Sequence, residues 1–426
     1  MHEVMNHKNS PPFLIHFKNP FFWVFFAFGP VAFGGGKGMI LLLLALFLSC
    51  LWTGIKGKGV FRQLFNIKKD ISLPFFFLLG IWGYMTVSSF WSFEPLASLG
   101  ASLRLLGVGL MTVYILYWIR SIPVEKIASS VYGLISGWLL LLVLFIGLFV
   151  IDQSHLYELP KRYWPQQIHK PAFLMALFFW PSCSYFIFYS PFSFLKKCPL
   201  LARCIFFMLL GVGTLSLLSF FGMKAAPIGL AFGLLGYLIL RGFPSSFSSI
   251  FNGMIAIGLF FPFLMSLFQN PFFLMYVTRP SWLHRLYIWD FVLSRIKEAP
   301  YFGWGLDTSR FFSSHSVTLS HPAQTESAPL FVHLLPLHPH NAFLQMWLEG
   351  GMLGACLLAL FLGSLSHLLK KMSSSDEERA ILGGAFLTFF IPFYVSFGIW
   401  QTWWIATQCF FTILWIFIKK TNEFKR

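Results

Sequence analysis

Residues 127–151 read IASSVYGLISGWLLLLVLFIGLFVI, a run without a single Asp, Glu, Lys or Arg. An α-helix needs roughly 17 to 25 mostly apolar residues to cross about 30 Å of hydrocarbon. The run therefore predicts a membrane-spanning helix, and similar runs on either side of it predict about twelve in all. The others lie near residues 14–34, 38–54, 73–90, 96–119, 171–189, 204–221, 224–240, 250–268, 342–369, 380–397 and 402–418.

The composition agrees with this pattern. Hydrophobic residues make up 57% of the 426 residues, charged residues only 11%, and the mean hydropathy is +0.71. A soluble globular protein is less apolar and carries more charge. The formal net charge of +16 does not indicate a nucleic-acid-binding protein, because the basic residues separate apolar runs instead of forming one patch. The predicted class is an all-α integral membrane protein.

The distribution of Lys and Arg predicts the orientation. Short cytoplasmic loops are enriched in Lys and Arg, and most of the basic residues fall inside if the N-terminus is cytoplasmic. The first apolar run has no small-residue cleavage site, so we expect a retained helix, not a removed signal peptide. An even number of helices then places both termini in the cytoplasm. Residues 269–341 face outward as one large loop between the ninth and tenth helices.

Three regions follow from this topology. Residues 1–268 are expected to form helices 1–9, residues 269–341 the outward loop with short helices, and residues 342–426 helices 10–12 with a cytoplasmic tail. All six cysteines lie in predicted helices or on the inner side, so disulfides cannot hold the loop together. Their spacing does not match a zinc site, and no metal or cofactor is predicted.

The outward loop holds most of the polar chemistry. Arg285, Trp289 and Val292 share one side of a predicted amphipathic helix that ends before Pro300. Gly303 and Gly305 allow backbone turns with positive φ.

The last predicted outward residues precede the tenth helix. Asn341 suits the N-cap of that helix, which places His338 and His340 at its positive end. Glu349 lies within the helix or at its outer end, where it either supports the site by pairing with a nearby base or takes part in catalysis. As an alternative, both histidines could be ordinary cap or interface residues.

Four basic residues are candidates for binding an anion. Arg285 has the planar fork that matches phosphate oxygens and stands one helical turn before Trp289. Lys224 and Lys170 begin two predicted helices, and Arg104 lies within the fourth, where an intramembrane charge suggests a functional role. Snorkelling towards lipid headgroups is the alternative for Arg285 and for Arg104.

These motifs, in this order, resemble the O-antigen ligase and polymerase family of bacterial envelopes. The resemblance rests on Arg285-x3-Trp289, Pro300-x2-Gly303-x-Gly305, His338-Pro339-His340-Asn341 and Glu349-Gly350-Gly351. Many family members have an arginine where this chain has Lys224 and Lys170.

The resemblance implies a glycosyltransferase of the bacterial inner membrane. Such an enzyme takes a glycan from undecaprenyl diphosphate at the periplasmic face and joins it to lipid A-core or, in the polymerases, to another carrier-linked repeat. His340 is favoured as the base, and His338 would orient the acceptor or share that role. Arg285 would stabilise the departing diphosphate.

The aspartates form no Asp-x-Asp motif of the kind that binds a metal in nucleotide-sugar enzymes, so a metal-independent, inverting displacement is expected. A transporter of lipid-linked glycans remains the alternative from another class. Its expected internal repeats and broken helices are not evident in the sequence.

Overall fold

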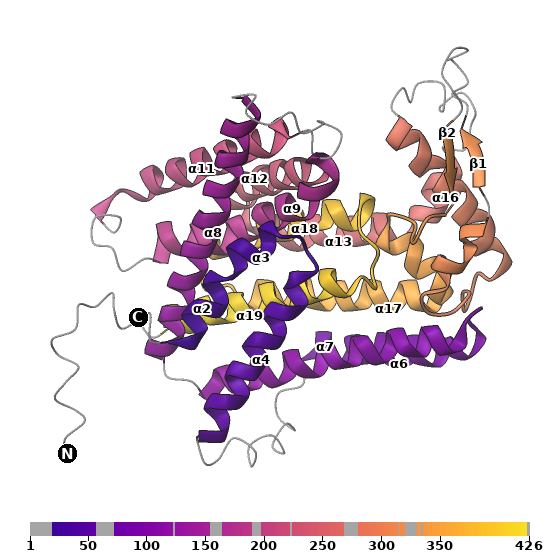
Figure 1. The fold of residues 1–426 in the computed structure, drawn as a ribbon, viewed down its shortest axis with the longest axis horizontal. Coiled ribbons are helices and arrows are strands. Elements are labelled where there is room, and N and C mark those ends of the chain that lie inside the picture. Colours follow the sequence, from indigo (N-terminus) through magenta and orange to yellow (C-terminus); the bar gives the residue numbers. More distant parts are fainter. Residues whose placement is uncertain are drawn as a thin grey trace.

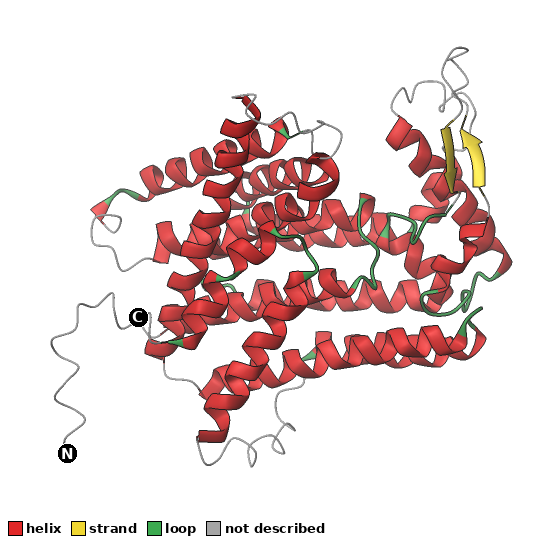
Figure 2. Ribbon diagram, viewed as in Figure 1, coloured by secondary structure: helices red, strands yellow, loops and turns green. Residues whose placement is uncertain are grey.

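The fold is almost entirely helical in the computed structural model of the 426-residue chain (Figures 1 and 2). The structure describes residues 19–56, 72–121, 124–153, 164–189, 197–221, 224–267, 280–314, 316–319, 330–333 and 335–423. Its helices are α2 Pro20–Phe26, α3 Phe28–Phe33, α4 Gly38–Lys56, α6 Leu73–Ser88, η2 Ser89–Trp91, α7 Pro95–Ser121, α8 Val124–Gln153, α9 Trp164–Ser184, η3 Tyr185–Tyr189, α11 Leu200–Phe220, α12 Ala225–Gly242, η4 Pro244–Ser246, α13 Phe247–Leu259, α14 Phe261–Leu267, α16 Pro280–Glu298, η5 Thr308–Ser314, α17 Ala342–Met372, α18 Asp376–Val395 and α19 Thr402–Glu423.

Nine helices within the described ranges are long and apolar enough to cross a membrane. A tenth candidate is the pair 244–259 and 261–267, which bends by 66°. Pro262 has no N–H to donate to the preceding turn, so a straight helix cannot continue through it. The apolar helices 20–33 and 38–53 are shorter. Each of the twelve predicted spans overlaps one of these elements. The all-α membrane class is confirmed, whereas the number twelve stays a prediction.

The loop contains one element that the sequence did not predict. Strands β1 (Ser316–Leu319) and β2 (Leu330–His333) form an antiparallel pair in which Ser316 faces His333. Together with α16 and η5, this hairpin lies at one end of the long axis (Figure 1).

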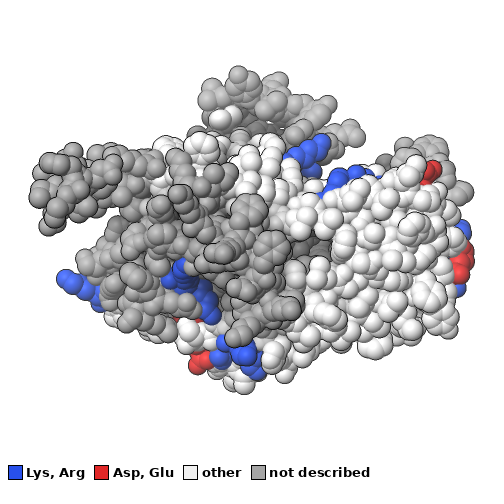
Figure 3. All heavy atoms as spheres, turned by 90° about the horizontal axis from the view of Figure 1, so that it is seen from below, with Lys and Arg blue, Asp and Glu red and all other residues white. Residues whose placement is uncertain are grey.

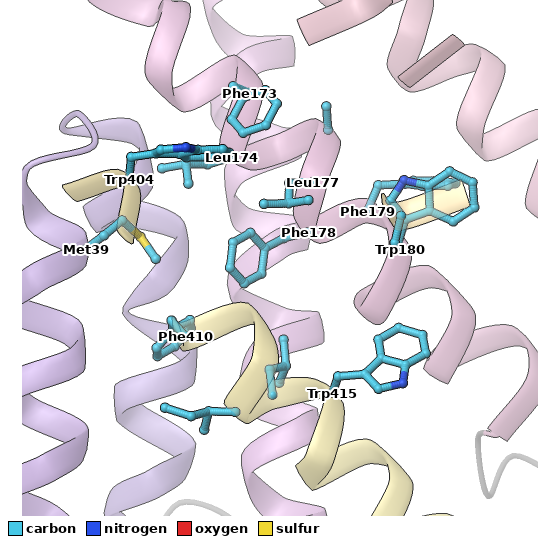
Figure 4. Close-up of a cluster of buried hydrophobic side chains, with 14 of the residues drawn as sticks. Met39, Phe173, Leu174, Leu177, Phe178, Phe179, Trp180, Trp404, Phe410 and Trp415 are labelled. Carbon is cyan, nitrogen blue, oxygen red and sulfur yellow. The ribbon is translucent and has the colours of Figure 1, made fainter. Parts of the chain in front are cut away.

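Helix α9 lies at the centre of the bundle, and nearly all of its residues from Ile168 onward are buried. Its Phe178 ring packs against Phe28 with ring centres 4.2 Å apart. The Phe410 ring of α19 lies 6.0 Å from Phe178 (Figure 4). Trp180 of α9 donates its indole N–H to Thr388 Oγ1 of α18 at 2.8 Å. Aromatic side chains thus connect α9 with the N-terminal and C-terminal helices.

Helices α12 and α18 approach each other through glycines. A Cβ added to Gly233 would lie 2.1 Å from Thr388 Oγ1 and 2.6 Å from the Gly384 carbonyl oxygen. A Cβ added to Gly229 would lie 2.8 Å from the Thr388 carbonyl oxygen. Small residues allow this close backbone contact, which is how helices associate where lipid removes the hydrophobic driving force.

The outer surface fits a bilayer. Large apolar side chains on the spanning helices are exposed, including Leu110 at 60% and Val143 at 60%. Figure 3 shows a broad area without charged side chains, with charged groups along its upper edge, at the right-hand end and in the left half. This is the surface of an integral membrane protein.

Candidate functional site

The Pro300–Gly305 segment forms backbone hydrogen bonds with α17 at a point where that helix is interrupted. Gly351 has φ 61° and ψ −161°, which interrupts the helical hydrogen bonds. The amides of Trp304 and Gly305 donate to the Leu348 and Glu349 carbonyls, both at 2.9 Å. In the opposite direction, the Met352 amide donates to the Pro300 carbonyl at 2.8 Å. The loop therefore replaces the hydrogen bonds that the helix loses.

The two predicted loop glycines are required by this contact. Gly303 and Gly305 have φ values of 69° and 93°, as predicted from the sequence. A Cβ on Gly303 would lie 2.5 Å from the Glu349 carbonyl carbon, and one on Gly305 would lie 2.6 Å from the Ser88 carbonyl oxygen. These glycines position the backbone and carry no chemistry of their own.

The end of α6 holds the same loop from the other side. Tyr84 donates its hydroxyl to the Gly350 carbonyl at 2.8 Å and to the Phe302 carbonyl at 3.0 Å. The Ser88 hydroxyl accepts from the Leu306 amide at 3.1 Å, and the Trp91 indole donates to the Gly303 carbonyl at 3.2 Å. The loop is thus fixed to the membrane bundle by hydrogen bonds.

Glu349 is fully buried below this loop. Its carboxylate accepts from the amides of Asp307 at 2.7 Å and Ser309 at 3.3 Å, from Gln345 Nε2 at 3.0 Å and from Trp400 Nε1 at 2.6 Å. Hydrogen bonds of this kind are needed to hold a buried carboxylate. Glu349 connects the loop, α17 and the α18–α19 connection, so it has the contacts of a supporting residue.

The segment 338–341, which contains both histidines, is held by contacts from α17 and from α16. Asn341 is the N-cap of α17, as predicted, and its Oδ1 accepts from the Leu344 amide at 2.9 Å. Trp289 is buried in α16 and donates its indole N–H to the Pro339 carbonyl at 2.9 Å. The predicted amphipathic helix is confirmed, because Trp289 and Val292 are both buried on the side of α16 that faces the bundle.

Arg285 and His340 meet at the C-terminal end of α18. The last carbonyls of a helix have no intrahelical donor. Arg285 Nε donates to the Val395 carbonyl at 3.0 Å, and His340 Nδ1 lies 2.7 Å from the next carbonyl oxygen, that of Ser396. The negative end of the helix also favours a cation such as Arg285. The structure therefore brings together the two residues that the sequence predicted as the centre of the site.

The contact with Ser396 fixes the proton on His340. A carbonyl oxygen can only accept, so Nδ1 carries the hydrogen and donates it. In the neutral ring, Nε2 then has an unshared electron pair, and no described residue hydrogen bonds to it. Burial lowers the pKa of His340 to about 4; the Ser396 contact opposes this shift, and the positive charges of Arg285 and His284 add to it. His340 is thus neutral near pH 7 and can accept a proton at Nε2.

His338 has a different environment. Its Nδ1 accepts from the His340 amide at 3.2 Å, and its Nε2 lies 2.9 Å from Gln401 Nε2. Its ring packs over Gly398, where a Cβ would lie 2.8 Å from the imidazole. Burial, together with the positive charges of His340 and Arg310, lowers the pKa of His338 to about 3. Because both ring nitrogens have protein neighbours, His338 is better placed to position His340 than to act as the base.

The other three predicted cations differ in their position relative to His340 and Arg285. Lys170 lies over the Trp403 ring at 5.2 Å, and the neighbouring His169 ring is 5.5 Å from Phe397, so α9 reaches the α18–α19 connection. Lys224 is exposed at the start of α12, which runs antiparallel to α18 and begins at the Val395 end. Arg104 is exposed on α7 and makes none of the contacts described for the histidines or Arg285. Lys170 and Lys224 thus lie at the end of the bundle that carries His340 and Arg285. Arg104 does not contact either of these two residues.

Several residues of the site were missed by the sequence analysis. Gln345 accepts from the Ile399 amide at 2.9 Å, and Trp400 and Gln401 contact Glu349 and His338. Gln345 stands one helical turn before Glu349, a spacing that could have been noticed. Val395 and Ser396 contribute backbone carbonyls, which leave no trace in the sequence.

A neutral histidine, His340, thus lies beside Arg285 at one end of the membrane bundle. Together they could hold an anionic group next to a base. Residues 185–359 match the family model described as O-antigen ligase, and this range includes Arg285, both histidines and Glu349. Over that segment, the match confirms the resemblance to the O-antigen ligase family that the sequence motifs indicate.

Similar proteins include three from Rickettsia that are provisionally named as polysaccharide ligases. The protein of R. bellii is 33% identical over 226 residues, 51% of each chain. Those of R. conorii and R. prowazekii are 32% identical over 213 residues and 33% identical over 211 residues, which cover 49% and 48% of this chain and 50% of theirs. The chain spans about half the length of the curated relatives it matches. No solved structure shows a significant match.

Proposed function

We propose that this protein is an O-antigen ligase that transfers a glycan from undecaprenyl diphosphate to lipid A-core. The observation that carries the proposal is that Arg285 and His340 contact neighbouring carbonyls, of Val395 and Ser396, at the C-terminal end of α18. One residue can bind an anionic leaving group while the other accepts a proton. The match to the O-antigen ligase family supports this reaction class.

The proposed step is a direct displacement at the anomeric carbon. His340 Nε2 takes the proton of an acceptor hydroxyl as its oxygen attacks, and the bond from the sugar to the diphosphate breaks with inversion. Arg285 stabilises the charge that develops on the diphosphate. A guanidinium presents five N–H donors, so its anchor to Val395 is compatible with a bidentate phosphate contact. No metal takes part in the proposed step.

Lys170 and Lys224 add positive charge around the diphosphate in this proposal. Both lie at the end of the bundle that carries His340, and a lysine supplies charge without bidentate geometry. Arg104 is assigned to the approach of the lipid carrier instead, because it is exposed on α7, away from the two central residues.

We further propose that residues 269–341 act as a periplasmic loop between two groups of inner-membrane helices, 1–268 and 342–426. Both termini then face the cytoplasm. In a cysteine-free variant, Lys297→Cys should react with an impermeant thiol reagent on intact spheroplasts, and Ser374→Cys should not. The reverse pattern would overturn the orientation.

The pH dependence of transfer should reflect the lowered pKa of His340. The base form is present above the pKa and is lost as the pH falls through it. For the free enzyme, kcat/KM should therefore stay constant from neutral pH down to about 5.5 and fall below about 4. In kcat the acid limb should lie at higher pH, because bound diphosphate offsets the positive charge of Arg285. An acid limb of kcat/KM near the ordinary histidine pKa of about 6.5 would contradict the proposed environment.

Arg285→Ala should weaken donor binding and slow transfer together, since Arg285 contacts the diphosphate before and during bond cleavage. Arg285→Lys should recover only part of each, because the bidentate fork is lost. Arg295→Ala, on the same helix but paired with Glu298, is the matched control and should change neither parameter. Equal kinetics for Arg285→Ala and Arg295→Ala would remove Arg285 from the mechanism.

Deletion of the gene, followed by a lipopolysaccharide gel, tests which acceptor is used. A ligase deletion should leave lipid A-core intact and remove the whole ladder of longer species. A core that carries a single repeat would identify the protein as a polymerase with the same donor. An unchanged ladder would contradict both functions.

A further inference from the structure

A cavity of about 480 Å³ lies at the other end of α17, far along the helix from Asn341. Ser248 at the start of α13, His367, Lys370 and Lys371 in the last turns of α17, and Arg379 in α18 line it. In Figure 1, α17 runs along the long axis of the molecule, with α16 and the hairpin at its first end. The cavity is therefore separate from the site around His340.

The lining is strongly positive. Lys370, Lys371 and Arg379 contribute three cations, and no carboxylate is among the lining residues in the described part of the chain. The three carboxylates in the first turn of α18 have other partners: Asp376 pairs with Arg379 Nη1 at 2.7 Å, Glu377 pairs with Arg241 Nε at 3.2 Å, and Glu378 accepts from the Ser374 amide at 2.7 Å. None of these three carboxylates lines the cavity, so its three cations suit an anion.

Hydrogen-bond donors are also available there. Lys370 Nζ donates to Ser248 Oγ at 3.1 Å, which places the ammonium at the wall of the cavity. Arg379 Nε is buried and has no acceptor within the described residues. Arg379 is also held in place, by its pair with Asp376. The cavity thus presents three positive charges to one ligand, and two of the three side chains are fixed by protein partners.

The surface beside the cavity is apolar. Leu360, His367 and Lys371 lie at i, i+7 and i+11 and so share one face of α17. Leu360 is 52% exposed on this spanning helix. A ligand with a charged head and an apolar tail would fit the basic cavity and the apolar face of α17 beside it. Basic pockets between membrane helices commonly bind lipid headgroups. We propose that the cavity binds the phosphate group of an anionic membrane lipid, whose acyl chains lie along α17.

Native mass spectrometry of the purified protein, with phosphatidylglycerol or phosphatidylcholine added, tests this site. Phosphatidylglycerol should bind preferentially, and Lys371→Gln and Arg379→Gln should each weaken that binding about fivefold. Lys197→Gln removes one exposed charge outside the cavity and should have no effect. Lys371 is exposed, so its variant keeps the test valid even if Arg379→Gln disturbs folding through the loss of the Asp376 pair.

Two results would overturn the proposal. The first is equal binding of phosphatidylglycerol by the parent protein and Lys371→Gln. The second is displacement of the lipid by inorganic phosphate at equal concentration, which would assign the cavity to a soluble phosphate. Because the measurement does not involve glycan transfer, its outcome is independent of the proposed ligase reaction.

Discussion

His340→Asn should lower the transfer rate by about 10²-fold or more while donor binding stays close to that of the parent protein. The ring of His340 is the proposed base, and its loss removes proton transfer without removing the arginine that binds the diphosphate. Asn is a sharper replacement than Ala because His340 has φ 56°, a conformation that Asn tolerates. His340→Ala should show the same loss of transfer with some loss of stability.

The controls for this experiment distinguish the two histidines. If correctly inserted His340→Asn protein works at near the parent rate while His338→Ala abolishes transfer, His338 is the base. If both variants remain active, the histidine pair serves only to begin α17.

Glu349→Ala should greatly reduce the amount of folded protein. The substitution leaves the Asp307 and Ser309 amides and the Trp400 indole without their acceptor in the interior. Each such buried donor costs about 1–3 kcal/mol, so the total is a large part of the stability of a typical domain. Thermal unfolding of the detergent-purified protein measures this loss. Glu349→Gln keeps the shape and one acceptor oxygen and should recover part of it.

Glu298→Ala is the matched control, because Glu298 lies on the surface of the same region and pairs only with Arg295 among the described residues. Exposed ion pairs contribute little, so its unfolding temperature should stay close to that of the parent protein. If Glu349→Ala is as stable as Glu298→Ala but inactive, Glu349 takes part in the chemistry and is not a supporting residue.

The parts of the fold that depend on local sequence could be predicted. Long apolar runs define the spanning helices, and Gly303, Gly305 and Asn341 adopt the backbone roles that their residue types favour. The β1–β2 hairpin was missed, because its two four-residue strands are separated by a long segment and pair through backbone groups. The bend between α13 and α14 was also missed, although Pro262 marks it.

The site was predictable in its members but not in its geometry. The sequence identified Arg285 and His340. In the structure these two residues contact the backbone carbonyls of Val395 and Ser396, not their side chains. Backbone carbonyls at a helix end exist in every helix, so residue types cannot show which end is used. The role of Glu349 likewise became clear only from its donors, which come from two separate segments of the chain and from its own helix.

The most direct test of the central claim is glycan transfer by the purified protein in a bilayer. The reaction contains undecaprenyl-diphosphate-linked glycan, lipid A-core and excess EDTA, and mass spectrometry follows the products. The proposed function predicts that glycan appears on lipid A-core with release of undecaprenyl diphosphate, at nearly the full rate despite EDTA, and that His340→Asn protein does not catalyse it. Transfer only to another carrier-linked glycan, or transfer that requires added Mg²⁺ or Mn²⁺, would contradict it.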